Sequence, residues 1–135
     1  MTTDISWLPL SLRKNIDLPK VVYEPVNDLY GGYFINGTKE IIVVEYEPQV
    51  PSTIVHEYCH YLQDISGKLP TKGSNVSLFE KYSYNKAIRL YFRTQWWEME
   101  ALLLEHKIAP TAVSRFWLKA LVLPSDTKFV EDICM

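Results

Sequence analysis

The sequence lacks most of the features that mark proteins outside the ordinary globular class. Only two of its 135 residues are cysteines, too few for a disulfide framework, which favours free thiols in a reducing compartment. No apolar run approaches the ~20 residues that span a bilayer, because the longest, Phe116 to Leu123, is interrupted by Lys119. The first residues have neither the basic start nor the apolar stretch of a signal peptide. We therefore expect a cytoplasmic protein without a membrane partner.

An excess of charge of one sign is also missing. The chain has 14 basic and 16 acidic residues, for a formal net charge of −2. Nucleic-acid-binding domains usually carry a basic surface, so the composition predicts no nucleic-acid partner. Hydrophobic residues make up 47% and charged residues 22%, both ordinary for a globular protein. A chain of this length suits a single domain over residues 1–135.

A β-hairpin is predicted in the first third of the chain. The run from Tyr30 to Ile35 precedes Asn36-Gly37, and the run from Glu40 to Tyr46 follows it with many β-branched residues. Asn-Gly between two β-prone runs is the strongest short-range hairpin signal. A third short run, Val21 to Glu24, ends at Pro25. These runs predict a small antiparallel or mixed sheet.

The segment from Thr53 to Ser66 is typical of a largely buried helix. Pro51-Ser52-Thr53 offers a hydroxyl cap at its start, and Ser66-Gly67 is a usual helix end. Its apolar residues recur with helical spacing: Ile54, Tyr58, Tyr61 and Ile65.

Further helices are predicted in the second half. Ser77 and Glu80 form a capping-box pattern that opens a helical segment up to about Phe92. A segment over about residues 94–106 follows without a breaker, so one continuous helix and two helices with a kink both remain open. A last helix is expected from about Pro110 to Val122. The predicted fold is α+β, with the sheet packed against three to four helices.

The helix over residues 53–66 carries His56-Glu57-Tyr58-Cys59-His60, an H-E-x-x-H pattern. On a helix, residues four apart lie one turn and roughly 40° from each other, so both imidazoles can bind one metal ion. Glu57 lies beside them and can reach a water on that metal. Cys59 points away from the pair and is expected to be a small buried residue. Three fixed positions also recur by chance, so the context decides.

A catalytic zinc takes three protein ligands, so a third must come from elsewhere. Glu98 and Glu100 lie two residues apart and point about 200° from each other on a helix, so only one can face the metal. Three residues after Glu98 comes Ala101, which permits a close approach of another helix, whereas leucines follow Glu100 at the corresponding positions. We favour Glu98, with Glu100 and His106 as alternatives.

The H-E-x-x-H helix followed by Glu98-Met99-Glu100-Ala101 resembles the gluzincin metallopeptidases, in which a later helix supplies a glutamate ligand. The likeness covers roughly residues 30–107 and is closest to the smallest members, the minigluzincins and the peptidase core of the ImmA/IrrE type. In these proteins a β-hairpin precedes the helix, and the resemblance implies that the chain is a bacterial or phage-encoded protein. One departure is Leu102, because larger relatives often have an Asp or Asn there that supports a histidine ligand.

The resemblance implies a zinc ion bound by His56, His60 and Glu98, with Glu57 as the general base. It also implies hydrolysis of a peptide or protein substrate. The strand over Ile41–Tyr46 is expected to be the sheet edge that binds an extended peptide.

Two other functions fit the same residues. One is a catalytically silent zinc-binding module with a regulatory role, against which the intact Glu57 argues. The other is a latent peptidase whose tail after Pro124 blocks the cleft until a partner or cleavage frees it.

Overall fold

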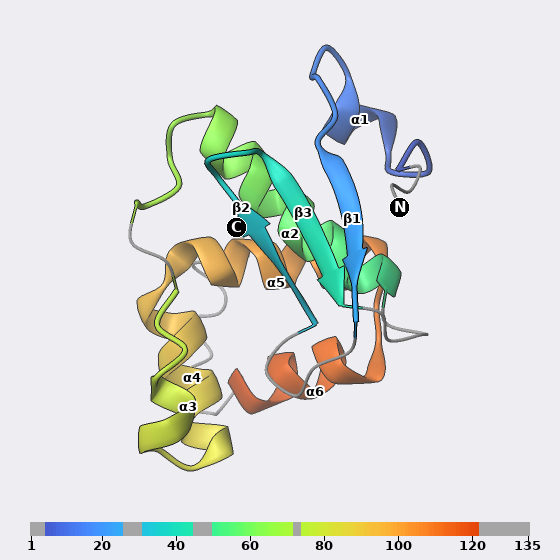
Figure 1. The fold of residues 1–135 in the computed structure, drawn as a ribbon. Helices are drawn as coiled ribbons and strands as arrows, with labels where there is room; N and C mark the ends of the chain where they lie inside the picture. Colours follow the sequence, from blue (N-terminus) through green and yellow to red (C-terminus); the bar gives the residue numbers. More distant parts are fainter. Residues whose placement is uncertain (1–4, 26–30, 45–49, 72–73, 122–135) are drawn as a thin grey trace. The chain divides into compact units, whose positions relative to one another are not determined.

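The computed structural model describes residues 5–25, 31–44, 50–71 and 74–121 (Figure 1). The chain divides into two compact units, Met1–Lys68 and Leu69–Met135. All described strands belong to the first unit, whereas the described elements of the second are helices. The α+β fold is thereby confirmed. The single domain over residues 1–135 stays a prediction.

The first unit contains a three-stranded mixed sheet of β1 (Lys20–Glu24), β2 (Gly32–Ile35) and β3 (Glu40–Val44). The strand order is β1-β3-β2, with β1 parallel and β2 antiparallel to β3. Residues 41–44 of β3 are buried, which accounts for their β-branched composition. The expectation that this strand is a sheet edge is wrong, because β1 and β2 occupy both of its sides. The edges of the described sheet belong to β1 and β2.

The predicted hairpin is present between β2 and β3. Its loop covers residues 36–39, and the left-handed backbone conformation falls on Lys39 (φ 59°) and not on Gly37. The Lys39 ammonium also forms an ion pair with Asp64, near the end of helix α2 (Val50–Ile65). The loop is thus tied to the helix that carries the histidine pair.

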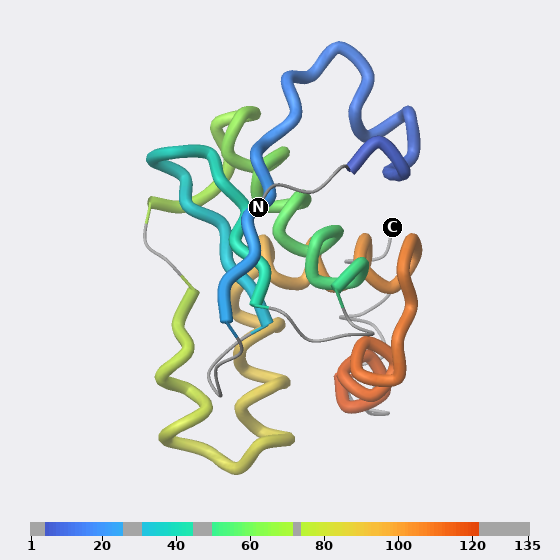
Figure 2. The backbone as a smooth tube through the Cα atoms, turned by 45° about the vertical axis from the view of Figure 1, so that its right-hand side comes forward, coloured from blue at the N-terminus to red at the C-terminus, as the bar shows by residue number. Residues whose placement is uncertain are grey.

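Helix α2 packs against β2 and β3 (Figures 1 and 2). The contact is closest at Gly32. A Cβ atom there would lie 2.6 Å from Cγ2 of Thr53 on the helix and 2.7 Å from the carbonyl oxygen of Ile42. Only glycine permits this approach without displacing the helix or the central strand.

The ends of α2 were predicted with different success. Its C-terminal end is confirmed, since Gly67 adopts the left-handed conformation (φ 77°) that closes many helices. At the other end the helix already begins at Val50. Ser52 and Thr53 therefore lie inside the first turn and do not cap the helix. The buried position of Ser52 shows that this turn packs into the unit.

The second unit contains α3 (Leu78–Lys81), α4 (Tyr84–Thr94), α5 (Trp96–Ile108) and α6 (Ala112–Leu121). Helix α4 packs against the other three, and α5 also packs against α6. Their shared core consists of five buried apolar side chains: Ile88, Phe92, Met99, Leu102 and Leu121. This core fixes the orientation of α5, which carries both candidate glutamates.

Two predicted helix boundaries are resolved by side-chain hydrogen bonds. The chain breaks between α4 and α5 at Gln95 (φ −127°, ψ 86°), so the kinked alternative holds. The Gln95 side chain donates to the Tyr91 carbonyl (3.0 Å) and accepts from the Asn75 amide (2.6 Å), which stabilises the break. The predicted capping box is wrong, because the Ser77 hydroxyl donates to the Asn75 side chain and makes no cap bond to α3.

Six helices are described, more than the three to four predicted, because α1 (Leu10–Arg13) and α3 are single turns of four residues. Over the described part of the chain, no helix combines the length and the apolar character needed to cross a membrane. Cys59 is a buried free thiol, as expected, and Cys134 lies outside the described residues.

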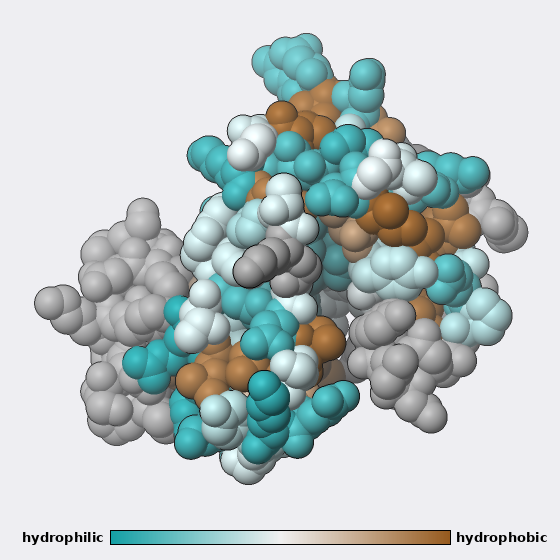
Figure 3. Space-filling model, turned by 60° about the vertical axis from the view of Figure 1, so that its left-hand side comes forward, coloured by the Kyte–Doolittle hydropathy of each residue, from teal (hydrophilic) through white to brown (hydrophobic). Residues whose placement is uncertain are grey.

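Figure 3, turned towards the side of α3 and α4, shows apolar areas separated by hydrophilic residues. Several large apolar side chains of the second unit are exposed: Val76, Phe79, Tyr82, Tyr84, Trp96 and Phe116. Trp96 among them is 45% exposed. Trp97 is half-buried.

Candidate metal centre

His56 and His60 lie on one side of α2, as their spacing predicts. Their ring centroids are 5.1 Å apart and the ring planes make an angle of 79°. His60 is buried and His56 is half-buried. Two imidazoles at this separation can direct one nitrogen each towards a common ion.

The orientation of the His60 ring is set by Gln63, which the sequence reasoning did not single out. Nδ1 of His60 lies 2.8 Å from Oε1 of Gln63, and the Gln63 amide nitrogen donates to Cys59 Sγ at 3.6 Å. Because the Gln63 amide nitrogen is directed to the Cys59 sulfur, the Gln63 amide oxygen accepts a hydrogen bond from Nδ1–H of His60. The neutral ring then presents the lone pair of Nε2, and such a supporting contact is usual for zinc-binding histidines.

Glu57 follows His56 on the same helix and is only 8% exposed. Glu57 lies three residues before His60, a spacing at which two side chains are neighbours on a helix surface. Its burial keeps bulk water away from the carboxylate. This suits a general base that accepts a proton from a single bound water. The position of Glu57 is therefore compatible with the predicted general base.

Glu98 lies in the first turn of α5 and is 4% exposed. Its Oε2 accepts a hydrogen bond from the Tyr91 hydroxyl at 2.9 Å and another from the Ser74 hydroxyl. The neighbouring Trp97 donates its indole N–H to Ser74 Oγ at 3.0 Å. Neither hydroxyl donor was predicted. The spacing of seven residues between Tyr91 and Glu98 is a weak helical signal, and Ser74 gave none.

Glu98 and Glu100 differ as the helical spacing requires. Glu100 is exposed, whereas Glu98 and the small Ala101 are buried, the latter with 0% exposure. The geometry within the second unit therefore favours Glu98 over Glu100 as the candidate ligand, because the Glu98 carboxylate is buried and the Glu100 carboxylate is exposed to solvent. The chemistry of zinc does not distinguish the two residues, because the ion binds any glutamate carboxylate.

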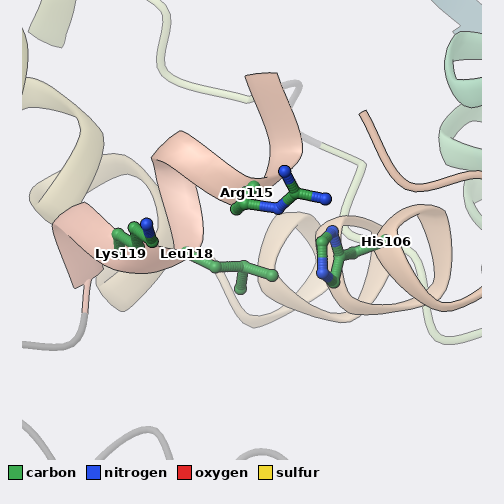
Figure 4. A pocket seen from close by; sticks show the side chains of 4 residues that line it. All are labelled: His106, Arg115, Leu118 and Lys119. Atoms are coloured by element: carbon green, nitrogen blue, oxygen red, sulfur yellow. The ribbon is translucent and has the colours of Figure 1, made fainter. Parts of the chain in front are cut away.

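His106, the weaker ligand candidate, has another role within the second unit. Its Nδ1 lies 2.8 Å from the hydroxyl of Ser114, which is fully buried near the start of α6. The ring also lines an open hollow with Arg115, Leu118 and Lys119 (Figure 4). Because two of these four residues are basic and none is acidic, the hollow does not suit a metal cation.

Two tyrosines of α2 are engaged away from the histidine pair. The Tyr58 hydroxyl donates to the Leu12 carbonyl at 2.7 Å, and the Tyr61 hydroxyl donates to the Asp17 carbonyl. Burial raises the pKa of both above the ordinary value of 10.0. These hydroxyls anchor the N-terminal segment to α2, so neither is a natural choice for stabilising a reaction intermediate.

The donor set of two imidazoles and a carboxylate fits zinc. The histidines and Glu57 belong to the first unit and Glu98 to the second. Within their own units, Glu57, His60 and Glu98 are buried, and His56 is half-buried. A comparison of the chain with protein-family models, with curated proteins and with solved structures gave no match.

Proposed function

We propose that the protein is a zinc-dependent metallopeptidase that hydrolyses peptide bonds in peptide or protein substrates. The observation that supports this most is the arrangement on α2, where the ring centroids of His56 and His60 lie 5.1 Å apart and the neighbouring Glu57 is buried. Gln63 adds the kind of supporting contact that zinc-binding histidines use. A chance histidine pair needs neither feature.

In this proposal His56, His60 and Glu98 hold the metal. A zinc ion bound there supplies Lewis-acid chemistry that polarises the scissile carbonyl and acidifies a water molecule. Glu57 accepts a proton from the attacking water as the C–O bond forms. It then delivers that proton to the amine that leaves as the C–N bond breaks. The Gln63 contact keeps the His60 ring in the tautomer that binds metal.

The proposal also includes a compartment. Cys59 is a free thiol in a chain with only two cysteines, which supports a reducing, cytoplasmic environment. The composition supports no nucleic-acid partner, because the formal net charge is −2.

The test begins with the metal. The full chain, purified without chelators, should hold about one zinc per chain by elemental analysis. His56→Ala and Glu98→Ala should each lose most of it, whereas Glu100→Ala should keep it. If the wild type neither contains zinc nor takes it up, the proposal fails. If only Glu100→Ala loses its metal, Glu100 is the third ligand in place of Glu98, and the proposal of a zinc metallopeptidase still stands.

The second step separates binding from turnover. Glu57→Gln should keep its zinc and lose hydrolysis of a quenched-fluorescent peptide mixture by roughly 10²–10⁴-fold, as expected for a general base. Glu100→Gln, an exposed glutamate, is the matched control and should keep full activity. A zinc-loaded wild type without hydrolysis would favour the regulatory module. Activity that appears only after deletion beyond Pro124 would favour the latent enzyme.

A further inference from the structure

The carboxylate of Glu98 is held by a directional chain of hydrogen bonds inside the second unit. An indole N–H can only donate, so Trp97 Nε1–H donates a hydrogen bond to Ser74 Oγ at 3.0 Å. The single hydroxyl proton of Ser74 is then directed to Oε2 of Glu98. Tyr91 donates to the same oxygen at 2.9 Å. Bonds from neutral donors to a carboxylate are charge-assisted and stronger than neutral ones.

The two donors come from separate parts of the unit. Tyr91 lies on α4, and Ser74 precedes α3 in the segment that follows the boundary between the units. This segment is fastened beside Glu98 by a second bond, since the Asn75 amide donates to Gln95 Oε1 at 2.6 Å. The position of the Ser74 hydroxyl therefore depends on the break between α4 and α5.

We propose that Ser74 and Tyr91 are positioning residues that fix the orientation of the Glu98 carboxylate for metal binding. This inference rests on the proposed function. Through Ser74, the backbone at residues 74–75 contributes to metal affinity although it supplies no ligand. Groups that hold a metal-binding carboxylate typically change metal affinity by about 10–100-fold when they are removed.

The competing explanation is purely structural. A buried carboxylate needs hydrogen bonds whether or not it binds a metal. In that case loss of either hydroxyl would lower the stability of the metal-free protein and leave its zinc affinity unchanged. The decisive readout is therefore zinc affinity, measured by competition with a chromophoric chelator, beside thermal unfolding of the metal-free chain.

Tyr91→Phe and Ser74→Ala should each weaken zinc binding by about 10–100-fold, and Ser74→Thr, which keeps the hydroxyl, should restore it. Because both donors reach the same oxygen, the double variant should lose less than the product of the single effects. Tyr82→Phe and Ser83→Ala are matched controls. Tyr82 is exposed, and Ser83 makes no cap bond to α4, so both should bind zinc as the wild type does.

The outcomes separate the two proposals. A wild type that binds zinc, with Tyr91→Phe and Ser74→Ala equal to it in affinity, would overturn the positioning role and leave the proposed function intact. A wild type without zinc binding would overturn both. If Tyr91→Phe fails to fold, the comparison of wild type, Ser74→Ala and Ser74→Thr still decides the question, because Thr keeps the hydroxyl group that Ala lacks.

Discussion

The helices that carry the candidate ligands, α2 and α5, support them in different ways. His60 on α2 is oriented by Gln63, three residues further along the same helix. Glu98 on α5 is held by Tyr91, seven residues away on another helix, and by Ser74, which lies 24 residues away. The support of the histidine is local in sequence, and that of the glutamate comes from the folded unit around it.

This difference has a consequence for the stability of the site. Helical geometry alone keeps His56, His60 and Gln63 together wherever α2 is formed. Glu98, in contrast, keeps its hydrogen bonds only while α4, α5 and the segment at residues 74–75 stay packed. Damage to the core of the second unit should therefore affect its ligand more than comparable damage affects the histidines. Matched changes in the two units can test this.

The largest effect is expected for Leu102→Ala. Leu102 has 0% exposure in the core of the second unit and lies one turn after Glu98 on α5. Truncation of a buried leucine costs about 2–5 kcal/mol. Hydrogen exchange followed by mass spectrometry should show lost protection in α4, α5 and α6, and zinc affinity should fall with it.

The matched control for this change is Leu10→Ala. Leu10 is 61% exposed on α1, so its truncation should change stability by no more than about 0.5 kcal/mol. If Leu102→Ala leaves zinc affinity unchanged while protection in α5 is lost, the link between the packing of the second unit and Glu98 is contradicted.

A smaller effect is expected for Gly32→Ala, the corresponding change in the first unit. The added Cβ would come within 2.6 Å of Thr53 Cγ2 and 2.7 Å of the Ile42 carbonyl oxygen. Overpacking of this kind costs about 1–3 kcal/mol. Either β2, the backbone of β3 or Thr53, three residues before His56, must shift, and hydrogen exchange should increase in β2, β3 and α2.

Gly37→Ala provides the control for the glycine. No atom lies within 4 Å of the Cβ that this change adds, and the backbone there is not left-handed. Its effect should be neutral or stabilising by up to about 1 kcal/mol. Equal effects at Gly32 and Gly37 would rule out the close approach of β2 to α2 as the cause.

The same contrast explains what could be predicted from the sequence. The hairpin and the relation of His56 to His60 were predicted because turn residues and helical spacing are local signals. The preference for Glu98 over Glu100 followed from the small Ala101 three residues after Glu98. Ser74 was missed because no sequence pattern predicts a hydrogen bond to Glu98, which lies 24 residues away. The contact of Gln63 with His60 could have been predicted, because side chains three residues apart are neighbours on a helix.

The errors have physical causes of the same kind. The strand β3 was expected at a sheet edge, but β1 pairs with it in parallel after a crossover that local patterns do not reveal. The capping box at Ser77 failed because its hydroxyl finds the Asn75 side chain instead. Short polar side chains have several hydrogen-bond partners nearby, and the packing of the folded unit determines which one they bind.

The smallest effect at neutral pH is expected for Tyr58→Phe, which tests the anchoring of α2 by the N-terminal segment. The change removes the hydrogen bond from the Tyr58 hydroxyl to the Leu12 carbonyl and should cost about 0.5–1.5 kcal/mol. Protection of α2 against hydrogen exchange should fall by the same amount, with α5 unaffected. An equal loss in both helices would contradict separate support.

The pH dependence of this variant gives a sharper test. Burial first, and then repulsion from Tyr61, raises the pKa of Tyr58 above 10.0 in the folded protein. The unfolded chain therefore releases this proton at a lower pH, and the stability that Tyr58 contributes is lost as pH rises above about 10. Phenylalanine has no proton to lose, so Tyr58→Phe should approach and then exceed the wild type in α2 protection between about pH 9 and pH 11. Tyr82→Phe, at an exposed position, is the control for the loss of a tyrosine hydroxyl as such. A difference between Tyr58→Phe and the wild type that stays constant with pH would show that the buried hydroxyl does not govern the alkaline stability of α2.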